Sequence, residues 1–158
     1  MKAATVVQIK KELQQRNPEE LLELCLRLSK FKKENKELLT YLLFEADHES
    51  GYIEAVQNEI DETFAAINTT SYFYIKKSIR KILRNVKKYI RYSGNKETEV
   101  LLLLYFCKKL QAFTPSITRN TTLLNLYERQ LLFVEKKISL LHVDLQYDFG
   151  LLIEELKR

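Results

Sequence analysis

Helix-breaking residues are scarce in this chain, and their scarcity constrains the fold more than any other feature. The 158 residues include only three glycines and two prolines. We expect each of them where a helix starts or stops, because glycine and proline are disfavoured inside helices. No run alternates apolar and polar residues, as a half-buried strand would. The sequence therefore predicts an all-α protein of seven or eight helices.

Capping residues and apolar periodicity give the helix boundaries. The clearest start is Asn17-Pro18-Glu19-Glu20, where Asn17 caps the free amide groups and Glu20 completes a capping box. The expected helices span about residues 5–15, 18–31, 35–46, 50–68, 72–92, 96–113 and 121–141. The segment 143–156 either continues the last helix or turns back near His142.

The third predicted helix, residues 35–46, has a capping residue and one apolar side. We expect Asn35 to cap its first turn. Four leucines recur on one side of it and are expected to face inward: Leu38, Leu39, Leu42 and Leu43.

The sixth predicted helix is apolar on all sides over Val100 to Cys107, so we expect it to be the most buried element. Short connections between helices imply antiparallel neighbours. Two architectures remain open at this point: a closed antiparallel bundle around the sixth helix, or helical hairpins stacked openly as in HEAT repeats. A chain of 158 residues suits one domain, spanning residues 1–158.

Three short motifs near the N-terminus carry a resemblance to known proteins. They are Ile9-Lys10-Lys11-Glu12-Leu13, the run from Pro18 to Leu24, and Glu37-Leu38-Leu39. Together they resemble the opening hairpins of uncharacterised all-helical bacterial proteins. The resemblance covers about the first quarter of the chain, and it implies the helical fold without assigning any functional residue.

Cysteine usage and the absence of long apolar runs bear on the compartment. Cys25 and Cys107 lie in leucine-rich stretches without a CxxC pair, and we interpret both as small buried hydrophobes in a reducing compartment. Residues 1–16 lack the apolar run of a signal peptide. The longest apolar run, Val100 to Cys107, is far shorter than the ~20 residues that cross a bilayer. The sequence thus predicts a soluble cytoplasmic protein without membrane insertion.

Charges are sorted into two blocks. From Glu37 to Ile75 there are eight acidic residues and no Lys or Arg, whereas Thr63 to Lys96 contains nine basic residues and no acid. Eight of the cations fall within an arc of about 140° on the fifth predicted helix, opposite its isoleucines. They are Lys76, Lys77, Arg80, Lys81, Arg84, Lys87, Lys88 and Arg91, and we call them the basic face.

The basic face is the candidate binding site, a strip of positive charge about 20 Å long. An acidic protein surface is the partner that we favour, either a different protein or a second copy, since the remainder of the chain is net acidic. Nucleic acid is the alternative, because phosphates attract such a row of cations and Phe73, Tyr74 and Tyr92 could stack on bases. A third interpretation is a solvated face without specific use.

Catalytic and metal-binding signatures are missing from the sequence. His48 lies among Glu45, Asp47 and Glu49, but this spacing matches no known metal motif. His142 and Asp144 would point to opposite sides of a helix. There is no recognisable nucleophile, glycine-rich phosphate loop or carboxylate pair. We therefore predict no enzymatic activity, no metal and no cofactor.

Overall fold

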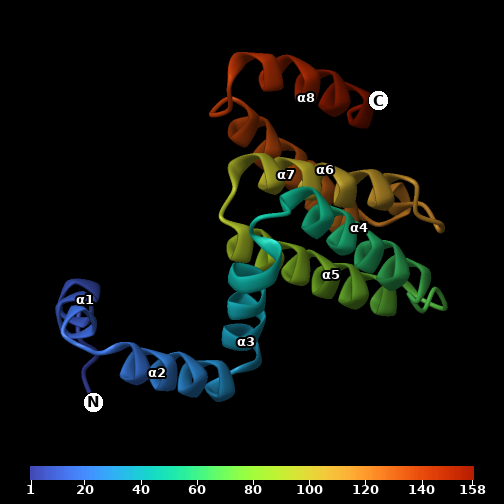
Figure 1. The fold of residues 1–158 in the computed structure, drawn as a ribbon. Coiled ribbons are helices and arrows are strands. Elements are labelled where there is room, and N and C mark those ends of the chain that lie inside the picture. The colour runs from blue at the N-terminus through green and yellow to red at the C-terminus, as the bar shows by residue number, and fades with distance from the viewer. The chain divides into compact units, whose positions relative to one another are not determined.

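The structure, a computed structural model, describes all residues from Met1 to Arg158 and contains eight α-helices and no strand (Figure 1). The prediction of an all-α, multi-helix fold is confirmed. The helices are α1 (Val6–Gln14), α2 (Pro18–Phe31), α3 (Lys33–Thr40), α4 (Glu49–Ala65), α5 (Tyr72–Ser93), α6 (Lys96–Gln111), α7 (Thr121–Ile138) and α8 (Val143–Leu156). The chain divides into two compact units, Met1–Phe44 and Glu45–Arg158, which are described separately below. The single domain stays a prediction.

Local capping signals predicted most helix starts correctly. The capping box of α2 is present, with the Glu20 amide donating to the Asn17 side chain at 2.9 Å and the Glu20 carboxylate accepting from the Asn17 amide at 3.0 Å. The α5 helix ends at Gly94, whose φ of 65° lies in the left-handed region that favours glycine. The segment 143–156 is a separate helix, and His142 caps it.

Several details of the prediction are wrong. Asn35 does not cap α3 but lies within it, and its side-chain amide donates to the Leu28 carbonyl at 2.9 Å. Gly150 lies in the interior of α8 and marks neither a start nor a stop. The alternative of one helix through His142 and Asp144 does not apply: His142 is a polar residue at the break before α8, and its Nδ1 lies 3.5 Å from the Asp144 carboxylate.

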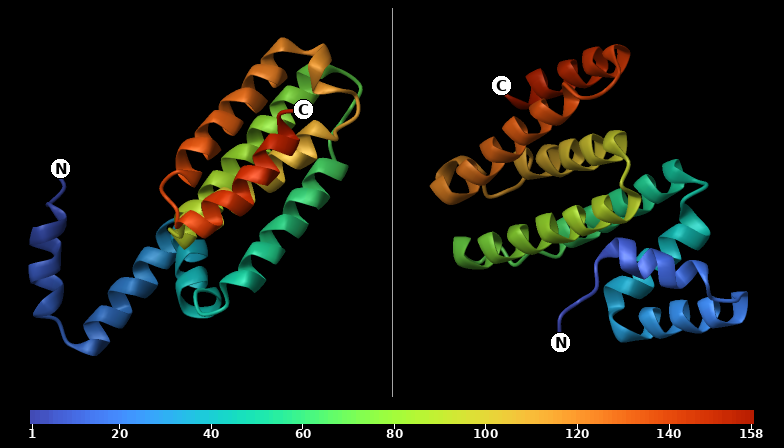
Figure 2. Two further views of the ribbon diagram at one scale, coloured as in Figure 1. Left: turned by 90° about the horizontal axis from the view of Figure 1, so that it is seen from above. Right: turned by 90° about the vertical axis from the view of Figure 1, so that its left-hand side faces the viewer.

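The unit Glu45–Arg158 is a bundle built around α6. Helices α4, α5, α7 and α8 all contact α6, and Figure 2 shows them running alongside one another (Figure 2). The apolar α6 side chains buried most completely are Val100, Leu102, Leu103, Phe106, Cys107 and Leu110. Of the two predicted architectures, this unit therefore has the bundle around the sixth helix.

Polar contacts join the end of α8 to its neighbours in this bundle. The Tyr127 hydroxyl on α7 donates to the Leu156 carbonyl at the end of α8 at 2.5 Å, and burial raises the pKa of Tyr127 to about 12. Gln111 on α6 also donates to the Leu156 carbonyl, at 3.2 Å. The last turn of α8 is thus held by both α6 and α7.

The unit Met1–Phe44 has the same helical periodicity but almost no core. None of the residues of α1, α2 and α3 is buried. Helix α3 packs against α2 across a groove of about 200 Å³ whose walls include Cys25, Leu28 and Leu39. Helices α2 and α3 therefore form a hairpin whose apolar sides remain largely open.

Two predictions about this unit are wrong for the same reason. Leu42 and Leu43 do not face inward and are 55% and 63% exposed, and Leu38 is exposed as well, while Leu39 is half-buried. Cys25 is exposed, although Cys107 is buried as predicted. Cys25, Leu38 and Leu42 all line the groove between α2 and α3, which remains open to solvent.

Candidate functional site

The sequence of α5 places the basic face on the solvent side of the bundle. Six apolar side chains of the helix are buried against its neighbours: Ile75, Ile79, Ile82, Leu83, Val86 and Ile90. The eight cations occupy the opposite side of the helix, where five are exposed and Lys76, Lys87 and Lys88 are half-buried. Both the helical conformation and the outward orientation of the basic face thus agree with the sequence pattern.

Carboxylates of the same chain do not neutralise most of the basic face. Seven of its members have no ion pair with any Asp or Glu: Lys76, Lys77, Arg80, Lys81, Arg84, Lys87 and Arg91. The Lys88 ammonium lies over the rings of Tyr89 and Tyr92, with its nitrogen 5.0 Å and 5.9 Å from their centroids. Neighbouring cations such as Arg80 and Arg84 repel each other by about 0.2–0.5 kcal/mol per pair in an isolated helix.

The centre of the basic face is a shallow hollow of about 270 Å³. Arg80, Arg84, Lys87 and Arg91 surround it, and Leu83 contributes an apolar wall. Three guanidinium groups therefore border one small surface, and each can donate two parallel hydrogen bonds to a carboxylate or a phosphate. The hollow is suited to anionic groups attached to a partly apolar segment.

Helix α7 extends this surface with an aromatic ring. The Lys87 ammonium lies 5.7 Å from the centroid of the Phe133 ring, and the Lys137 ammonium lies 5.0 Å from the same centroid. Lys137 also pairs with Glu99 at 3.0 Å. No sequence pattern pointed to Phe133 as part of this surface, because α5 and α7 are far apart in the chain and no local pattern indicates that they meet.

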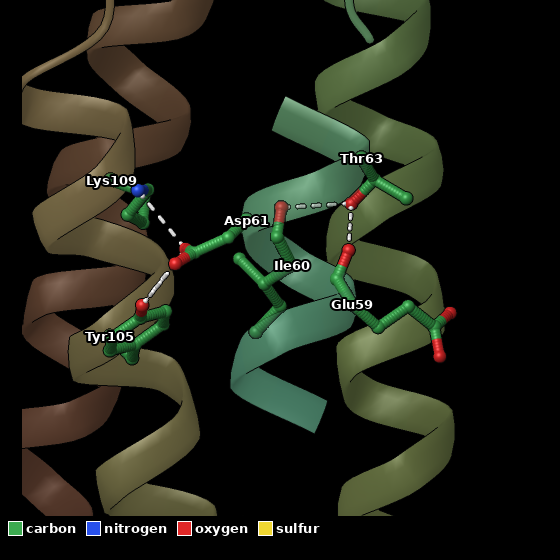
Figure 3. Close-up of polar contacts among 6 residues, drawn as sticks. All are labelled: Glu59, Ile60, Asp61, Thr63, Tyr105 and Lys109. Atoms are coloured by element: carbon green, nitrogen blue, oxygen red, sulfur yellow. Dashed lines mark hydrogen bonds and ion pairs between the residues drawn. The ribbon is translucent and has the colours of Figure 1, made fainter. Parts of the chain in front are cut away.

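The acidic block on α4 is engaged by other partners. Figure 3 shows Asp61 pointing toward α6, where its carboxylate accepts from the Tyr105 hydroxyl at 2.8 Å and pairs with Lys109 at 3.0 Å (Figure 3). Burial alone would raise the pKa of Asp61, but the hydrogen bonds from Tyr105 and Lys109 outweigh it and lower the pKa.

Two further acids of this region bind hydroxyl groups. Glu59 accepts from the Tyr89 hydroxyl at 2.7 Å, and Glu49 accepts from Thr98 at 2.6 Å and from Ser93. In Figure 3 the Glu59 carboxylate points away from Asp61 (Figure 3). Glu49, Glu59 and Asp61 thus bind hydroxyl groups or Lys109 and do not serve as counter-charges for the basic face.

No family model, curated protein or solved structure matches this chain. The resemblance of its first hairpins to all-helical bacterial proteins therefore stays a prediction. The function has to be inferred from the residues and their geometry.

The structure gives little support to a metal site or to a membrane-spanning helix. No group of three or more His, Cys, Asp and Glu residues is arranged to hold a metal ion. Glu49, one of the acids beside His48 in the sequence, binds Thr98 and Ser93. No helix combines the length and the apolar character needed to span a membrane. The basic face remains the strongest candidate.

Proposed function

We propose that this protein is a non-enzymatic, cytoplasmic interaction module that binds an acidic protein partner through the basic face of α5. One observation carries the proposal: seven cations line a single exposed strip without internal ion pairs, although acids of the neighbouring helix lie close by. A strip that repels itself gains most from an anionic partner.

The apolar groups beside the cations favour a protein partner. Leu83 lines the central hollow and Phe133 lies at its α7 side, so a bound segment meets both charged and apolar atoms. Arginine and aromatic side chains together are characteristic of protein interfaces. An acidic amphipathic helix has the required combination, with carboxylates for the guanidinium groups and methyl groups for Leu83 and Phe133.

The acids of α4 offer little charge to the basic face of a second copy. On α4, Glu49, Glu59 and Asp61 already bind hydroxyl groups or Lys109, so only Glu54 and Glu62 remain as exposed acids of that helix without such a partner. Self-association that pairs α4 with the basic face would have to break those contacts or use few charges.

Nucleic acid is the second candidate, favoured by two exposed aromatic side chains. Phe73 and Tyr74 lie at the start of α5, are 68% and 47% exposed, and contact each other edge to face with centroids 5.4 Å apart. Such rings can stack on unpaired bases while the cations bind phosphates.

Binding measurements with charge-reversal variants test the proposal. The probes are a helical peptide with Glu at every fourth position and a single-stranded oligothymidylate, each titrated at low and at moderate salt. We expect wild-type protein to bind the peptide and R80E/R84E to bind it at least tenfold more weakly. The matched control is K96E/R119E, which changes the net charge equally at exposed positions outside the basic face and should bind like wild type.

The outcomes separate the alternatives. An equal loss of peptide affinity in R80E/R84E and K96E/R119E would contradict the proposal. The absence of peptide binding by wild-type protein at low salt would contradict it too. Binding of the oligonucleotide with a steep salt dependence, weakened by Phe73→Ala, would favour the second candidate. A pull-down from native lysate with and without nuclease then identifies the partner.

A further inference from the structure

The apolar side of α2 extends beyond the parts that face its neighbours. Helix α3 lies along Cys25, Leu28 and Ser29, and Leu24 lines the hollow between α1 and α2. Leu22 and Leu26, one helical turn apart, are on neither of these sides and are 59% and 45% exposed. They form an apolar pair on the surface of α2 that no other helix of the unit Met1–Phe44 covers.

Two opposite charges border this leucine pair. By helical period, Glu19 and Lys30 lie on the same edge of α2, about 20–40° beyond Leu26. They are eleven residues apart, which is about 16 Å along the helix, so they cannot pair with each other within one helix. Neither residue has an ion pair elsewhere in the chain.

These leucines and charges of one α2 helix match those of a second α2 helix that runs in the opposite direction. A twofold axis through the midpoint of Leu22 and Leu26 places Leu22 of one helix against Leu26 of the other. The same operation brings Glu19 to within about one residue, or 1.5 Å of helix rise, of the level of Lys30 in the second copy. In a parallel pair, Glu19 of one copy and Lys30 of the other would instead lie on opposite flanks of the contact and about 16 Å apart along the helices, so they could not pair.

We propose that two copies of this protein associate through an antiparallel pair of α2 helices. Leu22 and Leu26 form the apolar centre of the contact, and Glu19 and Lys30 form one ion pair at each end. In such an isologous contact each pairing occurs twice, once from each copy, as in most homodimers. It uses no residue of the basic face and therefore stands independently of the function proposed above.

Sedimentation of the full chain over a range of concentrations tests the apolar part of the contact. We expect wild-type protein to shift from monomer to dimer as its concentration rises, and L22E/L26E to stay monomeric throughout. The control Leu132→Glu introduces the same type of charge at an exposed leucine of α7 and should dimerise like wild type. Far-UV circular dichroism verifies that the variants keep their helices. A wild-type protein that is monomeric at every concentration would overturn the proposal.

A charge swap tests the orientation. Glu19→Lys and Lys30→Glu should each weaken the dimer severalfold, whereas the double variant E19K/K30E should recover most of the lost affinity. Because these positions cannot meet within one helix, recovery identifies a contact between copies. Loss without recovery would contradict the antiparallel pairing. R80E/R84E should dimerise normally, and a monomeric R80E/R84E would assign the association to the basic face instead.

Discussion

Helices α2 and α6 have nearly the same ingredients but opposite surroundings. They contain 14 and 16 residues respectively, and each has five leucines and one cysteine. Helix α6 is enclosed by α4, α5, α7 and α8, whereas α2 packs chiefly on α3. The comparison teaches that apolar content determines which side of a helix can be buried, while the number of neighbouring helices determines whether it is buried.

The two cysteines provide the largest expected contrast. Cys25 on α2 is exposed, whereas Cys107 on α6 is fully buried, and burial raises the pKa of its thiol from 9.0 to about 12. At pH values below 9 the Cys107 thiolate is then about a thousandfold scarcer than that of an ordinary thiol. We expect a thiol reagent to modify one cysteine of the native protein rapidly and the second only after unfolding.

The assignment of the two thiols is checked with single variants. Cys25→Ser should abolish the rapid reaction with native protein, and Cys107→Ser should leave it unchanged. Rapid modification of both thiols in native protein would break the comparison, because it would mean that α6 opens as readily as α2.

Removal of one leucine from each helix gives the next largest contrast. Leu102 on α6 is fully buried, so Leu102→Ala should lower the free energy of unfolding by about 2–5 kcal/mol. Leu22→Ala on α2 should change it by less than about 1 kcal/mol, because that side chain is already mostly in water. Urea denaturation measures both, at a protein concentration low enough that association does not contribute. Similar losses in the two variants would contradict the different burial of the two helices.

The ion pair that joins α4 to α6 gives the smallest expected effect. The pKa of Asp61 is lowered below its ordinary value of 3.8, so its contribution to stability is complete above that pH and disappears as the pH falls through the lowered pKa. Asp61→Asn should cost a few tenths of a kcal/mol at neutral pH, since the pair is partly exposed. Urea denaturation of both proteins at successively lower pH should show the difference vanish in acid; a difference that persists there would rule out the charge as its cause.

Local patterns in the sequence predicted the helices and the side of α5 that carries the basic face. The capping box at Asn17 and the period of the isoleucines in α5 depend only on residues a few positions apart. For this reason the sequence predicts the first seven helices, the basic side of α5 and the burial of α6, whereas it leaves open whether residues 143–156 form a separate helix.

Contacts between distant helices could not be predicted in this way. The exposure of Cys25 and Leu42, the bond from Tyr105 to Asp61, and the position of Phe133 beside Lys87 all depend on which helices meet. A single sequence does not indicate that a tyrosine on one helix contacts an acid on another. The rotation of each helix about its axis and the shift between the two helices along their axes decide whether the side chains touch.

The enclosure of α6 also has a consequence for biosynthesis. This helix contacts α4 and α5, which precede it in the chain, and α7 and α8, which follow it, and α8 is the last of these to leave the ribosome. Until Val143–Leu156 has emerged, the side of the bundle that α8 covers is exposed. The Leu156 carbonyl, which accepts hydrogen bonds from Tyr127 and Gln111, is also missing. Ribosomes stalled before that segment should therefore hold a chain that chaperones recognise, and the emergence of α8 should end this recognition.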